Sequence, residues 1–382
     1  MKRSGTKILD NKKEKHSSRI MSLEFVRIVM TGIVFLSHME FLSNYSYGEI
    51  YTRYLHNATI GVDYFFVLSG FGLMAAYRKQ KDKSNYYIGG GIRYGLRKIR
   101  SVYSPYMISM IVMIPYVFCV SMADNKMGST VLKTGMKFVL CGTMMQSLSG
   151  MLKFAHAFNG AGWFISTIFI IYCATPKMLT FSNTLCKNKR KTVISTVVVI
   201  IFAAGIRYIL FLVQQKSSLD DISYSFPLAR ISYVLLGMCI YQLYRWWPRG
   251  SRKEAYYTVQ EIFIVVLTII WFLLRNSVEE NICRFTIYVL DLVIVGSLVI
   301  SFARECGKLS EAVSNSVIAK CGKDMMYVYL YHYPIRIYCD LFFQGHRYIW
   351  GEFTGLCEVA VIFTLTIVAC KMHKCIIRHC DV

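Results

Sequence analysis

The sequence predicts an all-α, polytopic integral membrane protein. Its mean hydropathy is +0.41, and 55% of its 382 residues are apolar. The charged residues make up 17% of the chain and gather between apolar blocks of about 20 residues, the length that a helix needs to cross a bilayer. This pattern excludes a soluble globular core.

About ten transmembrane helices can be drawn from the hydropathy. They lie near residues 22–43, 57–77, 103–123, 158–177, 193–213, 228–245, 257–274, 285–303, 324–343 and 353–370. The stretch 133–151 is short and polar, and we expect it either to re-enter the membrane or to lie at its interface. An even number of spans places both termini on the same side.

The distribution of basic residues predicts that side. They crowd alternate connections: the N-terminal arm and the segments 78–100, 187–191, 245–253, 304–323 and 371–378. Because cytoplasmic loops carry an excess of Lys and Arg, both termini are predicted to be cytoplasmic. This topology, together with attraction to anionic lipid headgroups, explains the net charge of +22. No nucleic-acid partner is therefore expected. The predicted organisation is a basic cytoplasmic arm, residues 1–20, a transmembrane domain, residues 21–370, and a cytoplasmic tail, residues 371–382.

The 13 cysteines are scattered through apolar segments and the tail, with no CxxC pair. They are expected to be reduced and packed as small apolar residues. We predict neither a disulfide framework nor a metal site.

Two ionisable residues in the first span, Arg27 and His38, lie eleven positions apart. At about 100° and 1.5 Å per residue they project from one helix face, about 16 Å apart along the axis. Arg27 alone fits equally well a topology anchor that reaches the headgroups. His38 and Asp63, in the second span, have similar predicted depths, so we hypothesise that Asp63 accepts a hydrogen bond from the imidazole.

Several sequence motifs resemble those of the membrane-bound acyltransferase-3 family, whose members acylate cell-envelope glycans and related acceptors. Arg27 and His38 with ten residues between them, followed by Gly61-Val-Asp-Tyr-Phe-Phe-Val-Leu-Ser-Gly-Phe71, resemble its opening. Three later motifs resemble family motifs and follow in the same order: Arg97-Lys-Ile-Arg100 with Pro105-Tyr106, Gly160-Ala-Gly-Trp163-Phe-Ile-Ser166, and Tyr329-Leu-Tyr-His332-Tyr-Pro334. The resemblance covers residues 21–370.

The resemblance implies an O-acyltransferase of the bacterial plasma membrane. Its donor would be a cytoplasmic acyl-CoA, by default acetyl-CoA, used as a substrate, with no permanently bound cofactor. The acceptor would be a hydroxyl of an extracytoplasmic or lipid-linked carbohydrate, and glycan biosynthesis proteins would be partners. Arg97 and Arg100 become candidates for binding the CoA phosphates, although from the residues alone they fit plain positive-inside residues.

Acyl transfer to a hydroxyl needs a base or an acyl carrier, and positive charge for the developing oxyanion. His38 fits either role, with Arg27 and Asp63 as the other catalytic candidates. Trp163, Ser166 and His332 are candidates for substrate binding or for lining the cavity. Pro334 would free backbone carbonyls beside His332, which favours a polar lumen there.

Two other classes stay open. A transporter or flippase of lipid-linked saccharides would also have about ten spans, but the two halves show no corresponding Gly/Pro-broken segments. A sensor or scaffold would not need His38, Asp63 and His332 buried together.

Overall fold

The computed structural model describes residues 20–380, apart from 57–58, 82–89, 125, 248–249, 251, 279–281 and 345–350. It is 84% helical, and its described residues form no strand, which confirms the all-helical class. The predicted basic arm, residues 1–20, lies outside the described residues except for Ile20.

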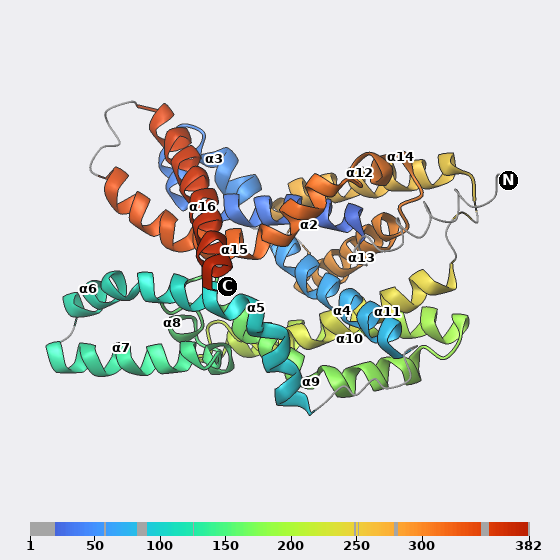
Figure 1. Ribbon diagram of the computed structural model, residues 1–382, viewed down its shortest axis with the longest axis horizontal. Helices are drawn as coiled ribbons and strands as arrows, with labels where there is room; N and C mark the ends of the chain where they lie inside the picture. The colour runs from blue at the N-terminus through green and yellow to red at the C-terminus, as the bar shows by residue number, and fades with distance from the viewer. Residues whose placement is uncertain are drawn as a thin grey trace.

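Figure 1 shows the helices in chain order. The long helices are α2 (Met21–Ser37), α4 (Thr59–Lys81), α5 (Gly91–Val112), α6 (Ile114–Asp124), α7 (Met127–Gly142), α9 (Trp163–Leu185), α10 (Lys189–Gln214), α11 (Pro227–Trp246), α12 (Glu254–Val278), α13 (Arg284–Ala303), α15 (Ser316–Gln344) and α16 (Phe353–Cys380). The short ones are η1 (Glu40–Asn44), α3 (Gly48–Ile50), the π-helical turn η2 (Tyr51–Leu55), η3 (Gln146–Ser149), α8 (Leu152–Ala155) and α14 (Lys308–Ala312).

Seven helical segments among the described residues are long and apolar enough to cross a membrane: α4 with its preceding turns, α5 with α6, α9, α10, α12, α13 and α16. Each predicted span overlaps a helix, but α2, α11 and α15 fall outside this set of seven. Helix α2 has only 17 residues, and α15 carries several charged side chains. Ten spans therefore stays a prediction, and seven is the number that length and composition support.

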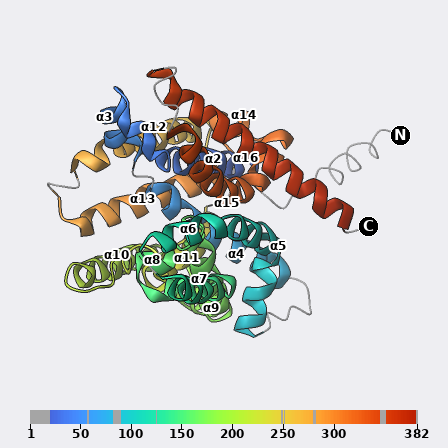
Figure 2. The same cartoon turned by 90° about the vertical axis from the view of Figure 1, so that its left-hand side faces the viewer.

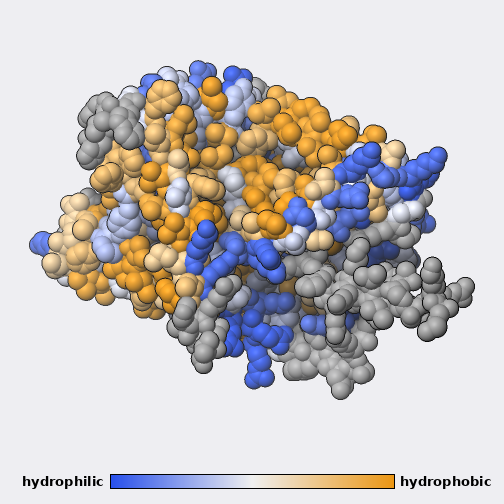
Figure 3. Space-filling model, turned by 45° about the horizontal axis from the view of Figure 1, so that its top comes forward, coloured by the Kyte–Doolittle hydropathy of each residue, from blue (hydrophilic) through white to orange (hydrophobic). Residues whose placement is uncertain are grey.

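The outer helices present apolar side chains to the surroundings. On α10, α12 and α16 many Val, Ile, Leu and Phe side chains are more than a third exposed, as at Phe202, Phe263 and Phe363. Figure 3 shows a broad apolar surface, with hydrophilic residues gathered towards the right and the lower part of that view. This is the distribution expected when lipid replaces water around the middle of a protein.

The interior is built around the close approach of α4 and α11. A Cβ at Gly70 would overlap the carbonyl oxygen of Val234, and one at Gly237 would overlap that of Val67. Two glycines therefore let the backbones of these helices touch, as small residues do in membrane proteins. Helix α2 packs on the other side of this pair and against α15, which brings the first and the ninth predicted spans together (Figure 1).

The stretch 133–151 forms the C-terminal part of α7 and the 3₁₀ turn η3. Helices α6 and α7 lie side by side in both cartoon views (Figures 1 and 2). The predicted tail, residues 371–382, continues α16 as far as Cys380.

Candidate active site

His38 lies at the C-terminal end of α2. The sequence predicted a span reaching residue 43, but the α-helix stops at Ser37, and the chain continues through the 3₁₀ turn η1. The backbone N–H of His38 points to the carbonyls of Leu36 and Phe35 instead of continuing the α-helical ladder. This leaves the carbonyl of Val34 for the His38 ring, whose Nδ1 lies 2.8 Å from it.

The second histidine, His332, comes from the middle of α15. Its Nε2 lies 3.3 Å from Nδ1 of His38, and its Nδ1 lies 3.2 Å from the carbonyl oxygen of Val328. The His332 side chain is completely buried. The structure thus brings together two of the predicted site residues that lie 294 positions apart in the chain.

The backbone contacts fix which nitrogen of each neutral ring carries the proton. A carbonyl oxygen only accepts hydrogen bonds, so Nδ1 is protonated in both His38 and His332. His332 Nε2 then carries a lone pair and, at 3.3 Å, shares the Nδ1–H of His38 with the closer Val34 carbonyl, at 2.8 Å. The remaining nitrogen, Nε2 of His38, has its own lone pair, so it is equipped to take a proton or to attack a carbonyl carbon.

A cavity of about 290 Å³ lies in front of His38. Its lining combines an apolar wall with polar groups from η1, η2, α4 and the turn before α11. The lining residues are Val34, Ser37, His38, Glu40, His56, Thr59, Val62 and Tyr224. Glu40 also accepts a hydrogen bond of 3.1 Å from Arg336, one turn beyond His332 on α15.

Pro334 has the effect on α15 that the sequence predicted, in part. The proline has no N–H, so the carbonyl of Leu330 loses its usual helical partner. The side-chain amide of Asn159 donates to that oxygen at 2.8 Å and to the Ser109 hydroxyl at 2.9 Å. The freed carbonyl therefore joins α15 to α5 and to the segment before α9 and is not left to line a lumen.

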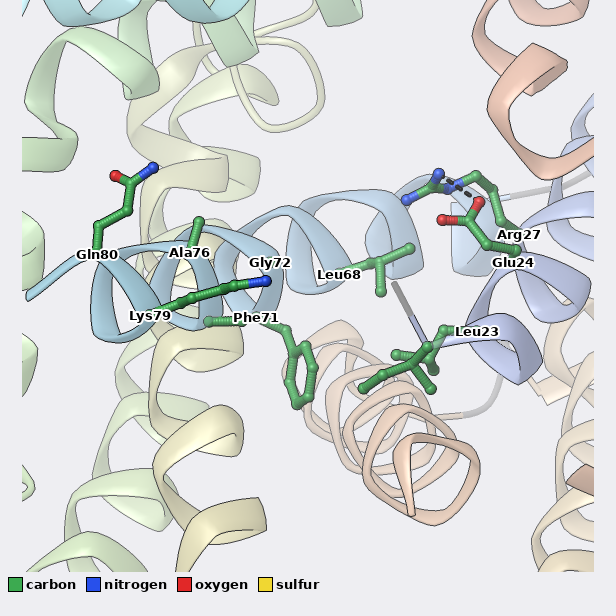
Figure 4. A pocket seen from close by; sticks show the side chains of 11 residues that line it. Leu23, Glu24, Arg27, Leu68, Phe71, Gly72, Ala76, Lys79 and Gln80 are labelled. Carbon is green, nitrogen blue, oxygen red and sulfur yellow. Dashed lines mark hydrogen bonds and ion pairs between the residues drawn. The ribbon is translucent and has the colours of Figure 1, made fainter. Parts of the chain in front are cut away.

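Arg27 lies on α2 and lines two other cavities, not the one that contains His38. Its Nη1 donates to Glu24 at 2.7 Å, and both side chains line a cavity of about 570 Å³ between α2 and α4. Lys79 and Gln80 line the α4 side of this cavity, and Figure 4 shows Lys79 extended along the helix towards Gly72. Two basic side chains from different helices thus face one open space.

A smaller cavity of about 180 Å³ continues from Arg27 into the protein. It also contains Thr31, one turn along α2 towards His38, and four aromatic residues, Phe65, Phe164, Tyr172 and Tyr329. The ring centroids of Phe65, Phe164 and Tyr329 lie 5.5 to 6.4 Å apart, and Tyr329 lies 6.0 Å from the His332 ring. We call Phe65, Phe164 and Tyr329 the aromatic septum, because these packed rings line the cavity of Arg27 and reach the histidine pair through Tyr329.

The predicted hydrogen bond between Asp63 and His38 is wrong. Asp63 is completely buried, and its Oδ2 lies 3.2 Å from Nη1 of Arg207 while its Oδ1 accepts a short hydrogen bond from Arg230. The physical reason is charge: two buried guanidinium groups need a carboxylate far more than a neutral imidazole does.

Arg207 and Arg230 are site residues that the sequence analysis missed. Both lie inside predicted spans, at 193–213 and 228–245. A charged residue within an apolar span is itself a signal of a functional or paired group, and this signal is present at both positions. Their aromatic neighbours include Tyr233, whose hydroxyl accepts from Arg207 at 3.0 Å, and Tyr288, whose ring centroid lies 4.2 Å from the Arg207 guanidinium.

The structure does not bring Arg97 and Arg100 to Arg27. Both are exposed on the first turns of α5, where Arg97 lies over the ring of Tyr94. Arg100 lines a separate cavity of about 520 Å³ with residues of α5 and of the turn after α7. Neither lines the two cavities that contain Arg27.

Trp163 and Ser166 support the site from outside its cavity. The Ser166 hydroxyl donates to the Met144 carbonyl at 2.8 Å and accepts from the Ser147 hydroxyl at 2.7 Å. These bonds attach the turn before η3 to α9. Trp163 is buried with its ring centroid 4.8 Å from that of Tyr224. Neither is among the residues that line the His38 cavity.

One of three comparisons with known proteins finds a match. A family model described as an acyltransferase domain, that of the acyltransferase-3 family, matches residues 20–371. Comparisons with curated proteins and with solved structures find no match. Because the family model covers nearly the whole chain, including both histidines, the protein belongs to the acyltransferase-3 family and is a membrane-embedded acyltransferase.

Proposed function

We propose that the protein moves an acyl group, by default acetyl, from cytoplasmic acyl-CoA to a hydroxyl of an extracytoplasmic or lipid-linked carbohydrate. The observation that carries the proposal is the His38–His332 pair at the cavity, with a lone pair on His38 Nε2. The expected location is a bacterial plasma membrane, with both termini cytoplasmic.

The donor enters from the side of Arg27. The cavity of about 570 Å³ between α2 and α4 offers Arg27 and Lys79, two cations suited to the phosphates of CoA. The thioester end extends along the face of α2, past Thr31 and the aromatic septum, towards His38. Eleven residues at 1.5 Å per residue place Arg27 and His38 about 16 Å apart along the helix axis. The CoA phosphates and the acceptor hydroxyl therefore bind at separate places in the protein.

His38 promotes the transfer itself. Its Nε2 takes the proton of the acceptor hydroxyl, or attacks the thioester carbonyl and carries the acyl group before passing it on. His332 positions the His38 ring by accepting from Nδ1–H and keeps the lone pair on Nε2.

The test uses the purified protein in nanodiscs, with acetyl-CoA carrying a labelled acetyl group as donor and total membrane glycolipids of the expression host as acceptor. We expect His38→Ala to lower label transfer by about 10²- to 10⁴-fold, the usual contribution of a positioned base. His373→Ala is the matched control, because His373 lies on α16 and bonds to Tyr331 away from the cavity. Equal activity in wild type and His38→Ala would contradict the proposal.

A second measurement separates the two chemical routes. Without acceptor, an acyl-histidine intermediate leaves label on the protein, and His38→Ala removes it, whereas direct transfer leaves the protein unlabelled. Mass spectrometry of envelope glycans, with and without the gene, then identifies the acceptor.

A further inference from the structure

We infer that Tyr224 is a further catalytic residue, whose hydroxyl donates a hydrogen bond to the acyl carbonyl oxygen during transfer. The buried cluster of Asp63, Arg207 and Arg230 supplies the positive charge behind it. This inference rests on the proposed acyl transfer at His38 and assigns the group that stabilises the oxyanion.

Tyr224 faces the same cavity as His38. It lies in the turn between α10 and α11, is half-buried, and lines the cavity of about 290 Å³ together with His38, Val34 and Val62. In the part of the chain that the structure describes, its hydroxyl has no hydrogen-bond partner, whereas the buried hydroxyls of Tyr64, Tyr106 and Tyr233 are all bonded. A donor that is left without a partner beside a reactive histidine is available to a substrate oxygen.

The position of Tyr224 is set by Arg230. The Nε of Arg230 donates to the backbone carbonyl of Tyr224 at 2.7 Å, and its guanidinium carbon lies 4.9 Å from the centre of the tyrosine ring. The ring also contacts Trp163, at 4.8 Å between centroids. Both backbone and ring are therefore held from behind, which is the preorganisation that oxyanion stabilisation requires.

The cluster behind Tyr224 carries unbalanced charge. It contains two guanidinium groups, Arg207 and Arg230, and one carboxylate, Asp63, which leaves one net positive charge. All three side chains are at most 4% exposed. Among the described residues, Nε of Arg207 and Nη2 of Arg230 have no hydrogen-bond partner. In a medium of low dielectric constant such a charge strongly favours nearby negative charge, and it makes the tyrosine O–H a stronger donor.

The transfer step balances without any other reactant. His38 Nε2 removes the proton from the acceptor hydroxyl as its oxygen attacks the thioester carbonyl carbon. The carbonyl oxygen becomes negative and is held by the Tyr224 O–H, which keeps its proton. The C–S bond then breaks, and the CoA thiolate takes the proton from His38, giving the ester and free CoA.

The test compares Tyr224→Phe with Tyr224→Leu in the labelled acetyl transfer assay described above. Phe keeps the ring over Arg230 and removes only the hydroxyl, so the protein should retain its thermal unfolding midpoint. We expect kcat to fall about 10²- to 10³-fold in both variants, as when one oxyanion donor is removed, with the KM for acetyl-CoA nearly unchanged. Tyr208→Phe on α10, which also loses one tyrosine hydroxyl but lies outside the cavity, should retain wild-type kcat.

Each outcome is decisive. If wild type shows no transfer, the proposed function itself fails. If wild type is active and Tyr224→Phe stays within threefold of it, the role of Tyr224 is overturned, whether or not Tyr224→Leu is impaired. A ring-fluorinated tyrosine at position 224, a stronger donor of nearly the same shape, should raise kcat above that of wild type, and an unchanged or lower kcat would also overturn the inference.

Discussion

The tautomer of His38 is selected by a neighbouring backbone group. Val34 would accept the N–H of His38 if α2 continued as an α-helix, but the helix ends and the imidazole takes that position. At His332 the ring also contacts the carbonyl four residues earlier, that of Val328, although α15 continues through this position. The orientation of both rings thus follows from helix geometry, and no acidic residue is needed to orient them.

At the same scale, the ion pairs of Asp63 with Arg207 and Arg230 predict which of two variants is less stable. Asp63→Asn leaves two unpaired buried cations, whereas Arg207→Gln leaves Asp63 and Arg230 as a balanced pair. Breaking a buried ion pair costs about 3–5 kcal/mol, so we expect Asp63→Asn to lower the thermal unfolding midpoint far more than Arg207→Gln does. Unfolding of the purified protein in detergent measures both, and equal midpoints would show that the cluster's charge is compensated by another group.

At the scale of helices, Asn159 compensates for the proline in α15. The carbonyl of Leu330 is buried and would have no partner without the Asn159 amide. Asn159→Ala should therefore reduce the free energy of unfolding by about 1–3 kcal/mol, the cost of a buried polar group without a partner.

The double variant tests this interpretation. Pro334→Ala restores the N–H that a continuous helix gives to Leu330, so Asn159→Ala combined with Pro334→Ala should be more stable than Asn159→Ala alone. Additive losses in the two single variants, measured as a double-mutant cycle, would mean that Asn159 acts elsewhere, for example only at Ser109.

The contact of α4 with α11 gives a second prediction at this scale. Gly70→Ala places a methyl group against the backbone of Val234 and should cost about 1–3 kcal/mol of stability. Gly72→Ala is the matched control two residues along the same helix, because a Cβ there meets nothing within 4 Å. Thermal unfolding should separate the two variants, and equal midpoints would contradict the close packing.

The sequence predicted the helices well because apolar length is a local property. Its error at the end of the first span has a physical cause: Met39, Phe41 and Leu42 are as apolar as the helix before them, yet they pack in a 3₁₀ turn, and hydropathy does not distinguish the two. The sequence also made His38, His332 and Arg27 candidates, through their motifs and their positions in apolar segments; the structure brings the first two together, and their roles stay predictions. Asp63 was assigned the wrong partner because its arginines lie 144 and 167 positions away, a distance at which only the tertiary fold decides pairing.

At the scale of the whole molecule, the alternation of charge predicts an orientation in the membrane that labelling of native cysteines can test. In Figure 1 the C-terminal end of α11 and helix α14, beside basic segments, lie towards the right, whereas α3 and the start of α16 lie towards the left. Cys283, between α12 and α13, is exposed, and hydrogen bonds from the Phe285 backbone and from Tyr208 lower the pKa of its thiol. A lower pKa leaves more thiolate at neutral pH, so Cys283 should react readily.

With cytoplasmic termini, Cys283 is extracytoplasmic, whereas the exposed Cys321 and Cys375 are cytoplasmic. An impermeant maleimide should therefore label Cys283 in intact cells, and the other two only after permeabilisation. Cys283→Ser is the control that identifies the label at this position, because Cys119 is exposed as well. Labelling of Cys321 or Cys375 in intact cells would reverse the proposed topology.

The aromatic septum has one further consequence, for permeability. The cavity at His38 and the smaller cavity at Arg27 have no lining residue in common, and the Tyr329 ring, which lines the second, lies 6.0 Å from the ring of His332. An acyl group that passes from one cavity to the other needs a path, and that path has to remain closed to ions and protons whenever no substrate fills it. We therefore expect the packing of Phe65, Phe164 and Tyr329 to limit ion leakage along the proposed route.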